Sequence, residues 1–421
     1  MSSSKKEQTI ISYEEMAKSK KLIESQREKN VIFKAVDEQG KPLKIWENVE
    51  TVMEFYNVSA RFNEVSKEVE VLGFKSTKID DSIMDIHSKC QKAGLKVDTN
   101  FLGLSINRIA SKHTYNPVTA YLDECYKNWN GETKRIDQVL DSITFRDDVD
   151  RFFAKKLIRK WFVQTVMIAY NTGKDKTNGI LIFHGEQGLG KTTWISTLIP
   201  NRLWSYFKEG MELDMKDKDK VFALISNWIV ELGEIDGSMK QEQAKLKAFT
   251  TQSNDKLRRP YAKSPDNYPR TTSFFGTVNK DEFLKDETGS RRYWVIPVIE
   301  LKRDFISQEE LDEFWGEVMH LWKTNGEVPY LDKLETQLLH QKNEEFNTTT
   351  PVHANIENRF YWDAPKNDWE WISYNLIVTH CNIKTGGSTL KKILKDKKIE
   401  YKRSGGSKYL MPPLNFDIPA I

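Results

Sequence analysis

The chain has 421 residues, so we expect two or three domains, because a single hydrophobic core rarely grows past about 250 residues. Hydrophobic residues make up 38% of the chain and aromatic residues 11%, which is enough apolar surface for a packed core and excludes a wholly disordered protein. The formal net charge is only +3, so a nucleic-acid surface requires local clusters of Lys and Arg.

The three cysteines lie far apart and form no CxxC pair, which argues against a zinc site or a disulfide framework and fits a reducing compartment. No apolar run approaches the ~20 residues that a membrane span needs. The first residues lack the apolar core of a secretion signal. We therefore expect a cytoplasmic protein with no membrane partner.

Residues 1–145 are expected to form an N-terminal, mainly helical region that serves as a collar or binds a partner protein. Residues 1 to about 30 are polar and have the weak helical spacing of a frayed arm. Further along, the pattern predicts a short strand at Val31–Phe33 and helices at Asp80–Ala93 and Tyr121–Trp129. No catalytic constellation is visible in this region.

Residues 146–347 have the pattern of an α/β domain. A buried helix is predicted at Asp148–Tyr170, ending at an Asn-Thr-Gly turn. Short apolar segments follow, and helical stretches separate the first three of them, which predicts a parallel sheet. The expected strands are Gly179–His184, Asn227–Leu232, Thr272–Val278 and Arg292–Val298. Two further helices are expected at Gln308–Lys323 and Leu331–Phe346.

The most specific motif is an unbroken GxxxxGK[ST] at residues 185–192, between an apolar strand and a helical stretch. Glycines at these spacings let backbone N–H groups and the start of the next helix surround phosphates. The motif predicts that the lysine neutralises the phosphates of ATP and that the threonine ligates Mg²⁺. The expected nucleotide-binding residues are Gly185, Gly188, Gly190, Lys191, Thr192 and Thr193.

An acidic group on a neighbouring strand is the second part of such a site. Glu231 and Glu234 lie at the end of the second predicted strand, three residues apart. Either carboxylate could serve with Thr192 as a metal ligand, and Glu234, just past the strand, is placed to polarise the attacking water. The division of work between the two residues stays open, as does the alternative that both are ordinary surface carboxylates.

A basic β-hairpin is predicted between residues 255 and 270, around a Pro/Asp/Asn turn. A cationic hairpin with an aromatic residue near its tip suits a single-stranded backbone held in a channel. Taken alone, the segment would be interpreted as a solvated surface hairpin. Its cations are Lys256, Arg258, Arg259, Lys263 and Arg270.

Two polar features follow the hairpin. Asn279 ends the third predicted strand, where its amide could orient the attacking water, although such residues often serve only as turn formers. Arg291 and Arg292 precede the fourth strand, and either could act as an arginine finger toward the γ-phosphate of a neighbouring subunit. The alternative for these arginines is an exposed ion pair with Asp286 or Glu287.

Several of these motifs occur together in one known group. Between residues 110 and 300 the chain resembles the virulence-associated protein E family, which is related to superfamily III helicases and to replication initiators of phages and pathogenicity islands. The resemblance implies an AAA-like hexameric ring that hydrolyses ATP between subunits and moves on DNA. The matching segments are GxxxxGKT, WIVELGEID, KLKAF, RRPYAK, YPR, GTVN and FLKDETGSRRYWVIPV.

By position, the resemblance implies that Lys191 and Thr192 belong to the nucleotide motif, Glu234 is the catalytic acid and Asn279 the sensor. It also implies that Lys263 lies on the pore hairpin that grips DNA. The chain departs from the family pattern at one point, because a common Asp-Glu pair is replaced by Leu-Gly-Glu at residues 232–234. That departure leaves the direct metal ligand open.

Residues 348–421 are expected to form a winged-helix-like DNA-binding domain. A helix with apolar residues on one face and lysines on the other is followed by a basic hairpin. Residues 384–408 hold nine Lys or Arg against two acids, a local balance of +7 that favours phosphate contact. The alternative is a soluble lid packed on the ring. The expected DNA-binding residues here are Lys391, Lys392, Lys395, Arg403 and Lys408.

The favoured hypothesis is an ATP-dependent DNA helicase or replication initiator of a mobile genetic element, with single-stranded DNA in the ring pore and duplex origin DNA on the C-terminal domain. The DNA contacts in the pore are assigned to Arg258, Arg259 and Lys263. An ATP-switched DNA-binding regulator without unwinding activity is the alternative. Primase chemistry is rejected for this chain, because residues 1–145 show no cluster of metal-binding carboxylates, but a separate primase or replication partner stays open.

Overall fold

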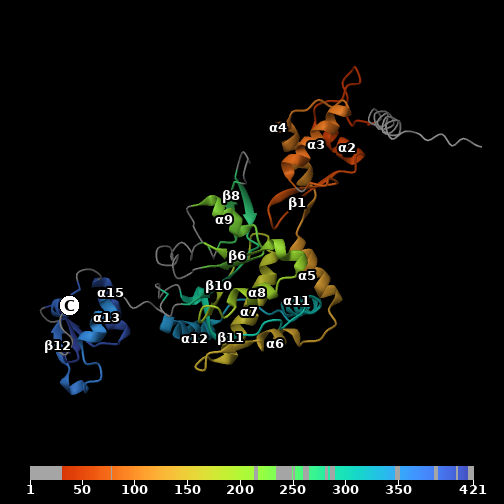
Figure 1. The fold of residues 1–421 in the computed structure, drawn as a ribbon. Coiled ribbons are helices and arrows are strands. Elements are labelled where there is room, and N and C mark those ends of the chain that lie inside the picture. Colours follow the sequence, from red (N-terminus) through yellow and green to blue (C-terminus); the bar gives the residue numbers. More distant parts are fainter. Residues whose placement is uncertain are drawn as a thin grey trace, which may run out of the picture. The chain divides into compact units, whose positions relative to one another are not determined.

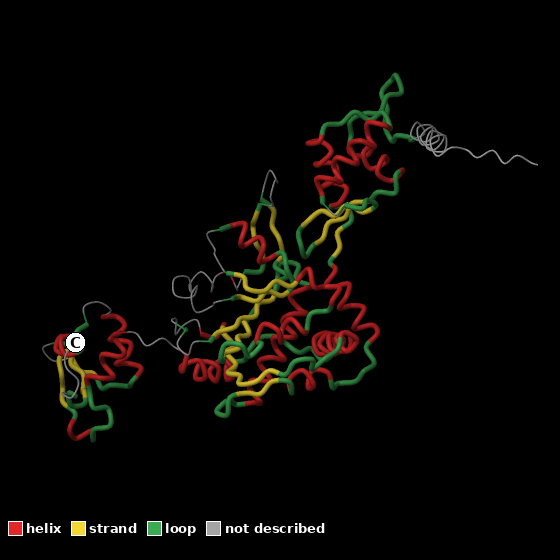
Figure 2. The backbone as a smooth tube through the Cα atoms, in the orientation of Figure 1, coloured by secondary structure: helices red, strands yellow, loops and turns green. Residues whose placement is uncertain are grey.

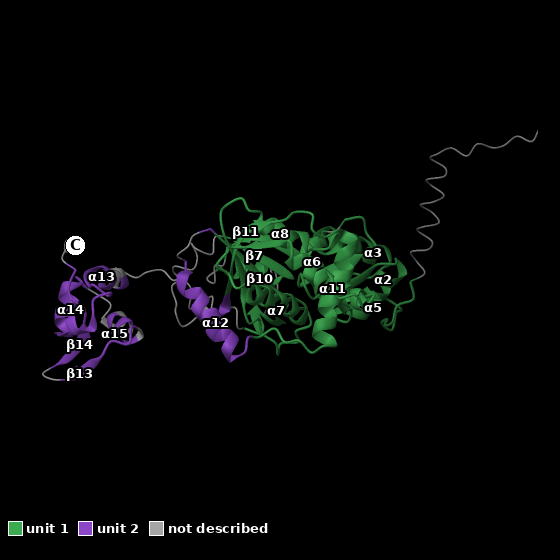
Figure 3. Ribbon diagram, turned by 90° about the horizontal axis from the view of Figure 1, so that it is seen from below, with its two compact units in different colours: residues 1–234, 245–278, 294–330 green, residues 235–244, 279–293, 331–421 purple. Residues whose placement is uncertain are grey.

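The computed structural model describes residues 31–76, 78–212, 217–233, 249, 252–258, 265–279, 283–284, 290–346, 351–383, 387–403 and 406–415. The chain divides into two compact units, coloured separately in Figure 3. Unit 1 comprises residues 1–234, 245–278 and 294–330, and unit 2 comprises residues 235–244, 279–293 and 331–421. The boundaries expected after residues 145 and 347 stay predictions. Within the described ranges, no helix has the length and apolarity to cross a membrane.

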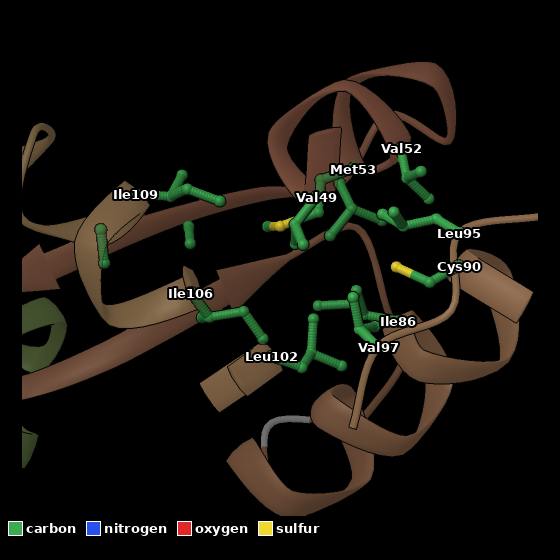
Figure 4. Packing of buried hydrophobic residues seen from close by; sticks show 13 residues of the cluster. Val49, Val52, Met53, Ile86, Cys90, Leu95, Val97, Leu102, Ile106 and Ile109 are labelled. Atoms are coloured by element: carbon green, nitrogen blue, oxygen red, sulfur yellow. The ribbon is translucent and has the colours of Figure 1, made fainter. Parts of the chain in front are cut away.

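The first part of unit 1 is a small α/β domain. Its helices are α2 (Trp46–Phe55), α3 (Ile79–Lys92) and α4 (Thr99–Ala110). They enclose an apolar core with residues such as Val52, Ile86 and Leu102 (Figure 4). A three-stranded sheet has the order β2-β1-β3. The strands are β1 (Ser59–Asn63), β2 (Glu68–Leu72) and β3 (Thr114–Tyr115).

This domain confirms one prediction and corrects another. The helix expected at Asp80–Ala93 is α3. The strand expected at Val31–Phe33 is wrong, because these residues pair with no strand and Ile32 is largely exposed. The sheet was missed, since β1 and β2 are short and largely half-exposed and therefore lack a strong apolar signal.

Three helices lead from this domain to the central sheet. They are α5 (Pro117–Asn128), α6 (Arg135–Leu140) and α7 (Arg151–Ala169). The helix α5 begins before the predicted Tyr121, because the side chain of Asn116 caps it by accepting from the N–H groups of Val118 and Thr119. Asp150 caps α7 in the same way at the N–H of Phe153, so the long predicted helix is confirmed with slightly narrower bounds.

The central sheet has six strands in the order β4-β11-β5-β10-β7-β6. Figure 1 labels β6, β10 and β11 of this sheet, and Figure 2 draws the strands in yellow. They are β4 (Ile143–Phe145), β5 (Ile180–His184), β6 (Phe207–Met211), β7 (Ile229–Leu232), β10 (Ser273–Val278) and β11 (Tyr293–Leu301). Strand β10 runs parallel to both β5 and β7, β6 runs parallel to β7, and β4 pairs antiparallel with β11. The predicted strands are confirmed. The edge strands β4 and β6 were missed, since they are short or partly exposed.

Among the described residues, the remaining helices of unit 1 are α8 (Lys191–Thr197), η1 (Asn201–Tyr206), α9 (Lys218–Ile225) and α11 (Gln308–Lys323). Buried tryptophans tie the helices to the sheet, because each indole N–H needs an acceptor once it leaves water. The indole of Trp161 on α7 donates to the carbonyl of Phe274 on β10 at 2.8 Å, and that of Trp228 donates to Thr165 on α7 at 3.1 Å. These bonds fix α7 against the strands that carry the site.

Unit 2 contains η2 (Ser290–Arg292), α12 (Lys333–Asn343) and η3 (Glu344–Phe346), followed by a C-terminal part. In that part a three-stranded antiparallel sheet has the order β12-β14-β13. Its elements are α13 (Pro351–Arg359), η4 (Lys366–Asp368), β12 (Glu370–Ser373), α14 (Tyr374–His380), α15 (Gly387–Asp396), β13 (Tyr401–Arg403) and β14 (Ser407–Met411). The predicted helix followed by a hairpin is thus present, and Leu390 and Leu394 are buried as the spacing indicated.

Candidate nucleotide and DNA site

The loop at residues 185–190 leaves the buried strand β5 and enters α8. Gly188 and Gly190 have φ of +88° and +80°, in the left-handed region that favours glycine. Gly185 is needed for a different reason, since a Cβ there would lie 2.4 Å from the carbonyl oxygen of Val298. The glycines of the motif therefore match the backbone that the loop adopts.

Lys191, the first residue of α8, folds back over this loop. Its Nζ donates to the carbonyl oxygens of Gly185 and Glu186, both at 2.7 Å. The side chain is only 6% exposed, and burial lowers its pKa. A phosphate at the loop would offer this ammonium stronger acceptors than the two carbonyls do. The neighbouring Thr193 is exposed on the first turn.

The carboxylate of Glu231 meets Thr192 across the sheet. Glu231 lies on β7 and is only 3% exposed. Its Oε1 accepts from the hydroxyl of Thr192 at 3.3 Å and from that of Thr277 at 2.8 Å, and its Oε2 accepts from the N–H of Gly210 at 2.7 Å. These donors hold a buried carboxylate in one orientation. Thr277 and Gly210 were not singled out from the sequence, although Thr277 lies two residues before Asn279.

The strand order explains how Thr192 and Glu231 come together. Strand β10 lies between β5 and β7, with Thr277 opposite Phe183 and Phe275 opposite Glu231. The loop after β5 and the C-terminal end of β7 thus lie at the same end of the sheet, with β10 between them. The oxygens of Thr192 and Glu231 suit a hard cation such as Mg²⁺, which prefers carboxylate and hydroxyl ligands. Glu234 lies outside the described residues.

Three further predicted residues adjoin strands of the sheet. Asn279 directly follows Val278, which is the register partner of His184, the last residue of β5. Arg291 and Arg292 lie in η2 immediately before β11, with Arg291 exposed and Arg292 half-buried. The acids proposed as their ion-pair partners, Asp286 and Glu287, lie outside the described residues, so that alternative stays a prediction.

The predicted hairpin is present. Strands β8 (Asn254–Leu257) and β9 (Asp266–Pro269) pair antiparallel, and Lys256 and Arg258 are exposed. The tip, with Arg259 and Lys263, lies outside the described residues.

One cation of the hairpin is buried and has a structural role instead of facing solvent. Arg270 is 0% exposed. Its Nε donates to Asp255 Oδ2 at 2.9 Å, its Nη2 donates to the other carboxylate oxygen, and its Nη1 donates to the carbonyl of Phe249. The guanidinium also lies 3.7 Å from the centre of the Phe249 ring. Arg270, which was named among the cations of the hairpin but not among its DNA contacts, is therefore buried and neutralised by Asp255.

The base of the hairpin is also tied to the end of α7. The Nδ2 of Asn171 donates to the carbonyls of Ser253 at 3.0 Å and Arg270 at 2.9 Å. The side chain of Asn254 donates to the carbonyl of Gly173 at 2.8 Å. The hairpin thus projects from a fixed base.

The C-terminal hairpin and α15 present several cations to solvent. Lys391, Lys395 and Arg403 are exposed, Lys408 is half-buried, and the side chain of Lys392 lies outside the described ones. Lys402 and Lys408 are cross-strand partners. Like charges placed directly opposite destabilise a sheet, and here the Nζ of Lys402 lies 3.8 Å from the centre of the Trp371 ring.

The comparison with curated proteins gives no significant match. Two solved structures are similar in fold. The apo structure of the NrS-1 C-terminal region (305-718) has 12% identity and a TM-score of 0.50, and the match covers 87% of this chain and 98% of that chain. The A form apo structure of the NrS-1 C-terminal region has 13% identity and a TM-score of 0.50, and the match covers 89% of this chain and 100% of that chain. The model of the virulence-associated protein E-like domain matches residues 122–348, more than half of the chain. The chain therefore belongs to the virulence-associated protein E-like family.

Proposed function

We propose that this protein is an ATP-driven motor with an AAA-type P-loop core that moves DNA during replication of a mobile genetic element. The observation that carries the proposal is the meeting of Thr192 and Glu231 beside a buried Lys191. A phosphate loop alone would bind many anions. A phosphate loop with an oriented carboxylate one strand away supports Mg²⁺-dependent ATP hydrolysis.

The roles of the residues follow from their positions. Lys191 and the N–H groups of the loop bind the β- and γ-phosphates. Thr192 and Glu231 would hold Mg²⁺, which when bound neutralises charge that develops on the phosphates. Glu234 accepts a proton from the attacking water, which Asn279 orients, as the bond between the γ-phosphorus and the bridging oxygen breaks.

The second half of the site comes from a neighbouring copy in a hexameric ring. Arg291 or Arg292 of that copy reaches the γ-phosphate and stabilises charge in the transition state. The exposure of Arg291 in η2 is consistent with a guanidinium available to another subunit. Hydrolysis therefore needs an intact interface between two copies.

The nucleotide site and the DNA-binding hairpin are connected through one β-strand, β10. The hairpin strand β9 ends at Pro269, and β10 begins at Ser273 and pairs with both β5 and β7. A movement at the end of β10 nearest the nucleotide is transmitted to the hairpin. The base of the hairpin is fixed by Asn171 and by the Arg270–Asp255 pair. The tip cations Arg258, Arg259 and Lys263 grip the phosphates of a single strand.

The C-terminal part supplies the contact with duplex DNA. Its order of helix, strand, two helices and hairpin, with β12 beside β14, supports a winged helix. In such a domain α15 faces the major groove and the hairpin lies along the backbone. Lys391, Lys392, Lys395, Arg403 and Lys408 would then contact origin DNA.

The test compares phosphate release by the parent, Lys191→Ala and Lys176→Ala, with and without single-stranded DNA. Lys176 is an exposed lysine outside the motif and serves as the matched control. Only Lys191→Ala should lose DNA-stimulated release. Displacement of an annealed oligonucleotide separates the motor from an ATP-switched regulator, which would hydrolyse ATP without displacing the strand.

A further inference from the structure

The buried carboxylate of Glu231 is held by both strands that flank β7. In the sheet, β7 lies between β10 and β6. The Thr277 hydroxyl of β10 donates to Oε1 at 2.8 Å, and the Gly210 N–H of β6 donates to Oε2 at 2.7 Å. Each neighbouring strand thus supplies one donor to one oxygen, so both oxygens are fixed across the sheet.

The donor from β6 depends on a bulge placed opposite Glu231. The register between β6 and β7 shifts between Lys208 and Met211, so Glu209 and Gly210 together oppose the single residue Glu231. Gly210 has a φ of +65°, in the left-handed region that glycine adopts at bulges. The bulge frees this N–H from the ladder of the sheet, and the N–H bonds to the carboxylate instead.

The donor from β10 is a polar residue in an apolar strand. Thr277 lies among the buried residues Phe274, Phe275 and Val278. Valine has the same shape and the same preference for strands, so packing alone does not call for threonine here. What the hydroxyl adds is the bond to Glu231.

The third donor to Glu231 differs from the other two. The hydroxyl of Thr192 lies 3.3 Å from Oε1, which is the longest of the three bonds, and Thr192 is itself a proposed metal ligand. Thr277 is therefore the side-chain donor to Glu231 that lies outside the proposed ligand set. We infer that Thr277 is a positioning residue, whose hydroxyl orients Glu231 toward the Mg²⁺ that Thr192 and Glu231 would hold.

This inference rests on the proposed function and deepens it, because it concerns how the same site holds its cation. Hydrogen-bond partners of metal-ligating carboxylates fix the orientation of the ligand, and removing them typically costs about 10- to 100-fold in metal affinity. Thr277 acts through Glu231, so its loss should weaken binding of the cation. Binding of the phosphates by Lys191 and the N–H groups of the loop should be preserved.

The experiment measures the affinity of the full chain for ADP by calorimetry, in EDTA and over a series of Mg²⁺ concentrations, which yields the affinity of the ADP complex for Mg²⁺. The parent is compared with Thr277→Val and Thr277→Ser. The matched control is Thr144→Val on β4, at the other edge of the same sheet, where the hydroxyl donates to Glu300 at 3.2 Å.

Thr277→Val should weaken Mg²⁺ binding about tenfold or more. Its ADP affinity in EDTA should equal that of the parent. Thr277→Ser, which keeps the hydroxyl, should recover the Mg²⁺ affinity, and Thr144→Val should match the parent in both conditions.

Equal Mg²⁺ affinity in Thr277→Val and Thr144→Val would overturn the inference. So would a loss of ADP affinity that is the same in EDTA and in Mg²⁺, or a loss that Thr277→Ser does not recover, because each would mean that the substitution disturbs the strand and not the orientation of Glu231. If Mg²⁺ does not change the ADP affinity of the parent, the proposed cation site fails together with the inference. A failure of the inference alone leaves that Mg²⁺ effect intact in the parent.

Discussion

Replacing Arg270 with methionine should loosen the DNA-binding hairpin from its base. The substitution leaves the Asp255 carboxylate buried, with its side chain 4% exposed and its partner removed. Breaking a buried pair in this way typically costs about 3–5 kcal/mol, because the remaining charge is uncompensated. The cost also includes the bond to the Phe249 carbonyl and the contact with the Phe249 ring.

Hydrogen–deuterium exchange, followed on peptides from β8 and β9, measures this loss locally. Amides that exchange through opening of the hairpin should exchange on the order of 10² to 10³ times faster in Arg270→Met. The control is Lys256→Met on β8, which is exposed and should change local stability by no more than about 0.5 kcal/mol. The double variant Asp255→Leu/Arg270→Met should recover much of the protection, since no charge stays buried.

Protection in Arg270→Met equal to that in Lys256→Met would refute this reasoning. It would mean that Arg270 contributes no more than a surface cation does, and that the hairpin has another anchor.

Three other predictions concern separate parts of the chain. Burial lowers the pKa of Lys67 to about 8 from the ordinary 10.5, so the unfolded chain holds this proton more tightly. Between these two pH values the free energy of unfolding of the parent, measured relative to that of Lys67→Met in denaturant titrations, should rise with pH by about 3 kcal/mol. If the difference in free energy between the two proteins does not change with pH, the burial of a charged Lys67 is contradicted. Lys263→Ala should keep most ATPase activity while strand displacement is lost; displacement at the parent rate would remove the hairpin from the mechanism. Lys391→Ala and Lys395→Ala should each reduce, by about 1, the magnitude of the slope of log affinity for duplex DNA against log salt concentration. Unchanged slopes in both variants would mean that duplex DNA binds to another part of the protein.

Much of the nucleotide site was predictable because its signals are local. A loop that must wrap phosphates needs glycine at fixed positions, so residues 185–192 could be recognised from spacing alone, and buried strands such as β5 consist of unbroken apolar runs. The contact between Thr192 and Glu231 was not predictable in the same way. It depends on β10 lying between β5 and β7, which is a property of the sheet and not of either segment.

Other features of the fold had ambiguous local signals. Arg270 has the same chemical type as the exposed cations around it, and only the register that brings it to Asp255 makes it structural. The β1–β2 sheet was missed because half-exposed short strands resemble loops in a single sequence.

The most direct test of the shared nucleotide site is a subunit-mixing measurement of phosphate release with single-stranded DNA present. One protein carries Lys191→Ala and keeps its arginines, and the other keeps Lys191 but carries Arg291→Ala and Arg292→Ala. Each alone should be nearly inactive, whereas a mixture should regain activity, because some interfaces then combine an intact Lys191 with the intact arginines of the next copy. A mixture no more active than the two separate proteins would contradict a site built from two copies.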